Sequence, residues 1–247
     1  MCRFTCYIGE SILIHNILFQ SKLSLVNQCK NAIYGMQVNM DGCGVAWYVQ
    51  FKKTPAIYRS MYPMCNDLNI ASIANHTRST CFIGHIRAAT QGMVCVNNCH
   101  PFHYDNLTFC HNGNIDNFDI TKRSKFYDFL KDRPNGNTDS ELLFCLCIFH
   151  YKKSCDELLA LKKTINTIKA WNLEGSHSFC LTNGNTLFVG RTKHLVNREC
   201  PTLYYSNNKT GLIISSEPCN ENTDWLAFPE NSISICRDMT VHTELFM

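Results

Sequence analysis

The stretch MCRFTCYIGE, residues 1–10, places a cysteine directly after the initiator methionine and runs into a predicted β-strand over residues 2–8. Removal of Met1 would leave the thiol of Cys2 and a free α-amine on one residue. A terminal amine has a pKa of about 7.7–8.0 and a thiol about 8.5, so the amine can accept the thiol proton near neutral pH. The stretch therefore predicts a nucleophile with its own base at the start of a strand, although a small second residue also occurs by chance.

The composition is that of a globular protein. Of the 247 residues, 45% are hydrophobic and 17% are charged, which argues against intrinsic disorder. The net charge of +3 comes without a long basic run, so we expect no binding to nucleic acid and none to a membrane surface. No segment has the apolar length of a signal peptide or of a membrane span. We therefore expect a cytoplasmic protein in which most of the 16 cysteines stay unpaired.

Short alternating or apolar runs predict many strands and few helices. The predicted strands cover residues 2–8, 43–51, 81–88, 107–111, 177–182, 186–190, 202–206, 211–215 and 232–236. Helical spacing is clearest over residues 139–151 and 155–171. The pairs Asn112-Gly113 and Asn183-Gly184 predict turns, the second within a hairpin. Because no linker or repeat interrupts the chain, residues 1–247 are predicted to form a single domain of mixed α and β structure.

The segment GHIRAATQG, residues 84–92, is a strand that runs into a polar loop. The planar guanidinium of Arg87 can form two parallel hydrogen bonds with a carboxylate, and the hydroxyl of Thr90 can add another. This pair suits the α-carboxylate of an amino acid, and Gly92 fits a hinge. For a lone arginine at a strand end, a surface salt bridge is the alternative.

The segment FCHNGN, residues 109–114, is a strand that ends in Asn-Gly. The side-chain amide of Asn112 and the backbone N–H of Gly113 can both donate to one point, as an oxyanion requires. The alternative is a plain tight turn, since Asn-Gly is common there.

The segment GNTDSE, residues 136–141, precedes a predicted helix. Thr138 and Glu141 have the spacing of a capping box. Asp139 falls in the first helical turn, where the helix dipole favours an ionised carboxylate that can receive an α-ammonium group.

A cluster of cysteines and histidines around residues 95–111 raises the question of a metal site. Its members are Cys95, Cys99, His100, His103, Cys110 and His111. The gaps between them do not match a zinc finger or ribbon, and no Cys-x2-Cys pair occurs. Free thiols and packed histidines are therefore expected rather than a metal.

Taken together in this order, the segments resemble the glutaminase domain of the class II (N-terminal nucleophile, Ntn) glutamine amidotransferases. The matching motifs are Met1-Cys2-Arg3, Asp41-Gly42-Cys43-Gly44-Val45, Gly84-His85-Ile86-Arg87-Ala88-Ala89-Thr90, Asn98-Cys99-His100-Pro101-Phe102, His111-Asn112-Gly113-Asn114, Thr138-Asp139-Ser140-Glu141 and Ser215-Ser216-Glu217-Pro218. The chain is most similar to the stand-alone branch that begins Met-Cys-Arg, which includes the predicted bacterial amidotransferases and the γ-glutamyl hydrolases. Cys43 stands where this branch usually has tryptophan. The resemblance therefore predicts the type of reaction more firmly than the identity of the substrate.

The resemblance implies an α+β fold, the four-layer αββα sandwich of Ntn hydrolases, with Cys2 at the start of an inner strand. Cys2 would attack the side-chain amide of glutamine or of another γ-glutamyl compound, and water would then release glutamate from a thioester. The implied roles are an oxyanion hole at Asn112 and Gly113, α-carboxylate binding by Arg87 and Thr90, and α-ammonium binding by Asp139. His100 matches a motif position that either contacts substrate or supports the loop at residues 87–95, which closes over glutamine in relatives.

The resemblance also implies a small-molecule substrate and neither a metal nor a cofactor. Only 17 residues follow residue 230, so we expect no acceptor domain. The protein then either acts alone as a γ-glutamyl hydrolase or donates ammonia to a separate acceptor subunit. Two further alternatives are a non-catalytic or metal-binding scaffold with the same fold, and an N-terminal-cysteine hydrolase of the bile-salt or penicillin amidase type. Arg87, Asn112 and Asp139 favour an amino-acid amide over the last of these.

Overall fold

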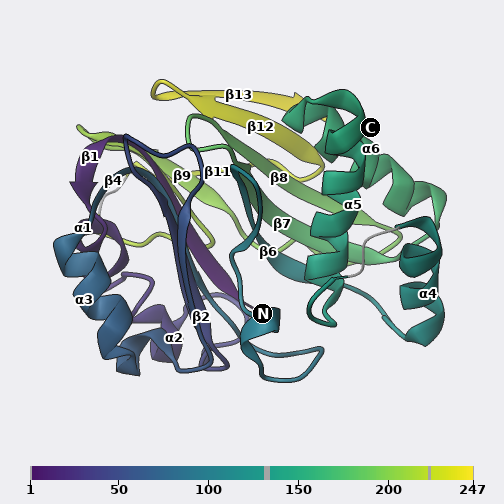
Figure 1. Ribbon diagram of the computed structural model, residues 1–247, viewed down its shortest axis with the longest axis horizontal. Coiled ribbons are helices and arrows are strands. Elements are labelled where there is room, and N and C mark those ends of the chain that lie inside the picture. The colour runs from purple at the N-terminus through teal and green to yellow at the C-terminus, as the bar shows by residue number, and fades with distance from the viewer. Residues whose placement is uncertain (1, 131–133, 222–223, 247) are drawn as a thin grey trace.

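The computed structural model describes residues 2–130, 134–221 and 224–246, and its strands form two antiparallel sheets that face each other (Figure 1). The first sheet has seven strands in the order β11-β9-β10-β1-β4-β2-β3. Their bounds are β1 (Arg3–Leu13), β2 (Cys43–Tyr48), β3 (Ala56–Ser60), β4 (Arg78–Ile86), β9 (Tyr204–Asn207), β10 (Gly211–Ser215) and β11 (Leu226–Ala227). β1 is therefore an inner strand, paired with β10 on one side and β4 on the other.

The second sheet has six strands in the order β13-β12-β8-β7-β6-β5. Their bounds are β5 (Phe102–Tyr104), β6 (Leu107–Ile115), β7 (Gly175–Thr182), β8 (Leu187–His194), β12 (Ser232–Arg237) and β13 (Thr240–Leu245). β7 lies at its centre and is buried along its whole length, since it carries a neighbouring strand on each edge.

Helices cover the outer face of each sheet (Figure 1). On the first sheet these are α1 (His15–Leu18), α2 (Gln28–Asn31) and α3 (Leu68–His76), with the short turn η1 (Met64–Asn66). On the second they are α5 (Asp139–Ser154) and α6 (Glu157–Ala170), with α4 (Ile120–Phe129) packed beside α5. A further short turn, η2 (Val96–Asn98), precedes β5. The α+β class and the αββα layering are thus confirmed.

The core between the sheets is rich in cysteine. Five buried cysteines lie there, namely Cys6, Cys81, Cys110, Cys180 and Cys236. All 16 cysteines lie in the described part of the chain, and none forms a disulfide. A buried free cysteine packs as a small hydrophobic residue, so these side chains fill the space between two closely packed sheets.

The predicted elements agree with the structure best where a strand or helix has a buried face. Both long predicted helices are confirmed as α5 and α6, and each begins behind a side-chain cap, from Thr138 and Asp156. The edge strands β3, β5, β11 and β13 escaped prediction, as did α1 to α4. β13 shows why, since its residues are almost all exposed and give no alternating pattern.

One predicted turn is wrong. The strand β6 does not end at Asn112-Gly113 but continues to Ile115, with Asn112 opposite Ser178 and Gly113 opposite His177 on β7. The hairpin between β7 and β8, with Asn183-Gly184 in its turn, is confirmed.

In the part of the chain that the structure describes, no helix combines the length and apolar character needed to cross a membrane.

Candidate active site

Cys2 lies where the start of β1 meets the end of β4. Arg3 pairs with Ile86 in the sheet, so the residues that follow β4 pass directly beside Cys2. The backbone N–H of Ala88 lies 3.4 Å from the Cys2 Sγ, and the Ala88 carbonyl oxygen lies 3.5 Å from the same atom. Burial raises the pKa of the Cys2 thiol, while the Ala88 N–H and the charge of Arg87 act in the opposite direction. The resting thiol is therefore protonated near neutral pH and needs a base to become a nucleophile.

Arg87 is buried beside the nucleophile, not on the surface, so a surface salt bridge does not describe it. Its backbone N–H donates to the Gly42 carbonyl at 2.8 Å, which fixes this residue against the loop before β2. Its guanidinium Nη1 donates to the Met93 carbonyl at 3.0 Å, and its Nη2 to the Gln91 carbonyl at 2.9 Å. The positive charge is thus held next to Cys2 by the loop that follows.

The loop after Arg87 is fixed from two sides. Asn98 Nδ2 donates to the Met93 carbonyl and to Asn137 Oδ1, each at 2.8 Å. Gly92 has a φ of +73°, and a side chain there would meet Asn137 and Asn98. Thr90 is exposed on this loop, so the structure does not place its hydroxyl in the buried site beside Arg87. Its role in carboxylate binding stays a prediction.

Asn112 and Gly113 lie near the end of β6, on the sheet opposite Cys2. The Nε2 of His85 on β4 lies 3.2 Å from the carbonyl oxygen of His111 on β6. This contact between the two sheets brings the Asn112 segment towards the nucleophile. Asn112 is 1% exposed, and its Oδ1 has no hydrogen-bond partner among the described residues. Gly113 has a φ of +144°, and a Cβ there would lie 2.1 Å from the Ser176 carbonyl oxygen. The strand therefore requires glycine at this position.

Asp139 begins α5 and points back towards the end of β6. Its two carboxylate oxygens accept hydrogen bonds from the backbone N–H groups of Ile115 and Ser140, each at 2.8 Å. Burial raises the pKa of Asp139 to about 6 and outweighs these hydrogen bonds. The charge of Asp139 in turn raises the pKa of Cys2, so the two groups lie within electrostatic range. The predicted capping box forms only in part, because Thr138 accepts from the Glu141 N–H while the Glu141 carboxylate accepts from the backbone of Asn135 and Gly136.

A column of buried histidines lies behind the site. His100 stacks on His85 with ring centroids 4.1 Å apart, and the Phe102 ring packs against its other side in a tilted arrangement at 4.4 Å. Neither ring nitrogen of His100 has a hydrogen-bond partner among the described residues. The Nε2 of His111 lies 3.0 Å from the Nδ1 of His177. Burial lowers the pKa of His85 to about 3 and that of His177 to about 4, so these rings are neutral at pH 7. The structure thus places His100 in a buried ring stack.

Several residues of the site carried no assigned role in the sequence-based prediction. Asp41 Oδ2 accepts from the Ala89 N–H at 2.8 Å and so fixes the chain just after Arg87. Ser140 Oγ lies 2.8 Å from His111 Nδ1 and 3.4 Å from the Asp139 carboxylate. Arg3 and Glu217 form an ion pair behind Cys2. All four lie in motifs quoted above, but their contacts depend on the pairing of strands.

The cysteines and histidines of residues 95–111 do not converge. Cys110 lies between the sheets, whereas Cys99 Sγ donates to the Ser60 carbonyl at 3.3 Å. Among the described residues, no group of three or more His, Cys, Asp or Glu side chains could hold a metal ion.

Comparison with known proteins gives a consistent result. The family model of the class-II glutamine amidotransferases matches residues 19–244. The yeast protein named "Probable glutamine amidotransferase DUG3", from Saccharomyces cerevisiae, is 29% identical over 98% of this chain and 83% of its own length. The gamma-glutamyl-hercynylcysteine sulfoxide hydrolase of Mycobacterium tuberculosis is 24% identical over 94% of this chain and 91% of its own.

Two solved structures share the fold. A glutamine aminotransferase class-II domain protein from Silicibacter pomeroyi superposes with a TM-score of 0.73 at 24% identity, over 99% of both chains. The glutamine phosphoribosylpyrophosphate amidotransferase of Bacillus subtilis superposes with a TM-score of 0.70 at 16% identity, over all of this chain and 49% of its own.

Proposed function

Because this chain belongs to the class-II glutamine amidotransferase family, we propose that it hydrolyses the side-chain amide of glutamine or of another γ-glutamyl compound, with Cys2 as the nucleophile. The observation that carries the proposal is the position of Cys2, whose thiol contacts the backbone of Ala88 with Arg87 and Asp139 in electrostatic range. A buried cation and a buried carboxylate within electrostatic range of the thiol fit a substrate with both an α-carboxylate and an α-ammonium group.

The first half of the reaction forms a thioester. After Met1 is removed, the α-amine of Cys2 accepts the thiol proton, and the thiolate attacks the amide carbon of the substrate. The carbon–nitrogen bond then breaks, and the amine delivers the proton to the departing ammonia or amine. Burial raises the pKa of the Cys2 thiol, so attack requires a base, and the α-amine on the same residue can serve as one. In the second half, water adds to the thioester, glutamate leaves, and the thiol regains its proton.

The tetrahedral intermediate needs donors for its oxyanion. Asn112 fits this role through its side-chain amide, and Gly113 through its backbone N–H, because both lie at the end of β6 on the sheet that faces Cys2.

Substrate binding is coupled to the loop after Arg87. A carboxylate that bonds to Nη1 and Nη2 of Arg87 displaces the carbonyls of Met93 and Gln91, which occupy these donors in the structure. The loop therefore rearranges when substrate binds. Gly92 suits a hinge, because a residue without Cβ adopts both its present φ of +73° and negative φ values at little cost. Asp139 receives the α-ammonium group, which is on the same α-carbon as the carboxylate.

Profiling of glutamate release tests the proposal. The enzyme is first verified by intact mass to begin at Cys2, and is then assayed on glutamine, glutathione and other γ-glutamyl amides. We expect glutamate from at least one of them, and no release from the same protein carrying an uncleaved N-terminal tag, because the tag blocks the α-amine. Equal release from the tagged and processed proteins would exclude the α-amine as the base.

A further inference from the structure

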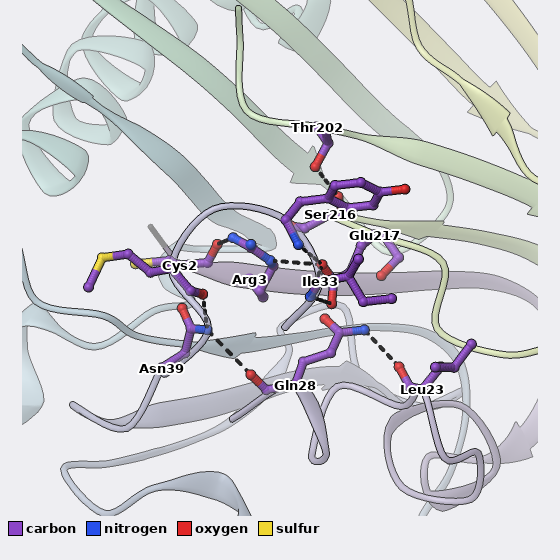
Figure 2. Close-up of polar contacts among 12 residues, drawn as sticks. Cys2, Arg3, Leu23, Gln28, Ile33, Asn39, Thr202, Ser216 and Glu217 are labelled. Carbon is purple, nitrogen blue, oxygen red and sulfur yellow. Dashed lines mark hydrogen bonds and ion pairs between the residues drawn. The ribbon is translucent and has the colours of Figure 1, made fainter. Parts of the chain in front are cut away.

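Arg3, the residue directly after the nucleophile, is buried with its guanidinium between Cys2 and Glu217 (Figure 2). Its Nη1 donates to the carbonyl oxygen of Cys2 at 2.8 Å. Its Nε lies 3.5 Å from Oε2 of Glu217. The two side chains are only 2% and 1% exposed, so water does not screen their attraction.

Glu217 is held from the other side by backbone. Its carboxylate accepts from the N–H of Ile33, at 3.1 Å and 3.0 Å to the two oxygens, and from the N–H of Tyr34 at 3.0 Å (Figure 2). Asn39 holds the segment that carries these N–H groups in place, because its Nδ2 donates to the carbonyls of Gln28 and Met36. The Glu217 carboxylate thus has a fixed position before it meets Arg3.

A buried ion pair by itself is weak evidence for stability, because the cost of removing two charges from water cancels much of their attraction. The arrangement is more informative about Cys2. This residue lies outside the strand, since β1 begins at Arg3, and its carbonyl accepts the guanidinium hydrogen bond. A carbonyl that is held by a charged donor fixes the backbone of the residue that also carries the thiol and, after processing, the α-amine.

We propose that Arg3 and Glu217 are positioning residues: Glu217 holds Arg3, and Arg3 holds the backbone of Cys2 so that its thiol and α-amine keep the geometry of attack. This inference rests on the proposed function, because it assigns a role within that reaction. Cys2 is then fixed at two points: its carbonyl oxygen accepts from Arg3, and its Sγ accepts from the N–H of Ala88. This role requires no contact of Arg3 or Glu217 with the substrate.

A purely structural ion pair would fasten the segment of Ile33 and Tyr34 to β1 without affecting the reaction beyond any loss of folded protein. The two roles make different demands. A structural role is satisfied by any arrangement that keeps the fold, whereas positioning requires a donor from residue 3 to the Cys2 carbonyl. Kinetics on folded protein therefore separates them.

The test compares Arg3→Met, Arg3→Lys and Glu217→Gln with wild type in glutamate release by the processed enzyme. Displacement of a reacting group by about 1 Å can lower the rate by about 10²-fold. We therefore expect kcat of Arg3→Met to fall by about 10²-fold, while KM changes little. Arg3→Lys keeps one donor and recovers part of kcat. In Glu217→Gln the charge that faces Arg3 is lost, and one of the two acceptor oxygens becomes an N–H donor. Because Oε2 accepts from Ile33 and Tyr34 and also faces Arg3, neither orientation of the amide restores all the contacts, so kcat falls as well.

Arg191 is the matched control. Its guanidinium is also largely buried and donates to three backbone carbonyls, those of Pro201, Phe228 and Cys200, and it pairs with Glu230 at 3.8 Å. We expect Arg191→Met to lower the melting temperature and leave kcat of the folded fraction near that of wild type.

The outcomes are distinguishable. If wild type releases glutamate and Arg3→Met keeps its kcat, or loses no more of it than Arg191→Met, the positioning role is overturned and the proposed function stands. If processed wild type releases no glutamate from any γ-glutamyl compound, the proposed function itself fails. Should Arg3→Met not fold, Arg3→Lys and Glu217→Gln decide: a kcat equal to wild type in both overturns the inference.

Discussion

The backbone N–H of Ala88 lies 3.4 Å from the Sγ of Cys2, although 86 positions separate the two residues in the chain. The contact exists because β1 and β4 are antiparallel neighbours, so the start of one strand meets the end of the other. It brings the thiol next to Arg87 and supplies a donor that partly offsets the effect of burial on the thiol pKa.

Replacement of the nucleophile should remove the activity. We expect Cys2→Ala to release no glutamate above background, because no thioester can form. Cys145→Ala is the control, since this cysteine lies on α5 and is only partly buried. The measurement is glutamate formed from glutamine by both variants, each verified to have lost Met1. Turnover by Cys2→Ala at the wild-type rate would rule out a covalent mechanism through Cys2.

Replacement of the proposed oxyanion donor should weaken the reaction without abolishing it. Loss of one such donor typically costs about 10²–10³ in rate, so Asn112→Ala should retain a measurable remnant. Asn185→Ala, in the exposed turn between β7 and β8, is the control. Comparison of kcat for the two variants checks the expectation. A rise in KM with unchanged kcat would instead place Asn112 in ground-state binding.

Arg87 should determine recognition of the α-carboxylate. Arg87→Met removes the fork of donors, so we expect a higher KM for glutamine and a smaller preference for glutamine over its α-carboxamide analogue. Arg78→Met, at the exposed start of β4, leaves both unchanged. The ratio of kcat/KM for the two substrates is the quantity to measure. An unaltered ratio in Arg87→Met would assign the carboxylate to another residue.

Asp139 should make catalysis depend on pH. Its pKa of about 6 means that the carboxylate is ionised above this value and can then receive the α-ammonium group. We expect kcat/KM to rise with pH through about 6 and to lose this limb in Asp139→Asn. The variant should also discriminate less between glutamine and an N-acylated analogue. Unchanged discrimination would rule out an interaction of Asp139 with the α-amine.

The same carboxyl should affect stability in the opposite direction. The pKa of Asp139 is higher in the folded protein than in the unfolded chain, so the folded state binds more protons between about pH 4 and 6. The free energy of unfolding therefore falls as pH rises through this interval, by roughly 3 kcal/mol for this group. Urea unfolding of wild type and Asp139→Asn across pH 4–8 measures the difference. Parallel pH profiles for the two proteins would contradict it.

Much of the fold could be predicted because burial leaves a local pattern. The buried residues of β1, β4, β7 and α5 produce an alternating, continuously apolar or helical pattern in the sequence. The edge strand β13 is exposed and pairs with β12 alone, so no periodicity marks it. At Asn112-Gly113 the turn propensity of the dipeptide was overruled, because pairing with β7 keeps the chain extended there.

The sequence by itself determined the family and the types of residue that chemistry at Cys2 would need, since each lies in a short motif that can be recognised locally. Tertiary structure alone decided how these residues meet: that Arg87 is buried and bonded to the carbonyls of Gln91 and Met93, and that Arg3 joins the Cys2 carbonyl to Glu217. The physical reason is that periodicity and propensity report the surroundings of a residue along the chain, whereas these contacts are set by strand order and register. Residues 3 and 217 meet because β10 pairs with β1 and carries Glu217 just beyond its end.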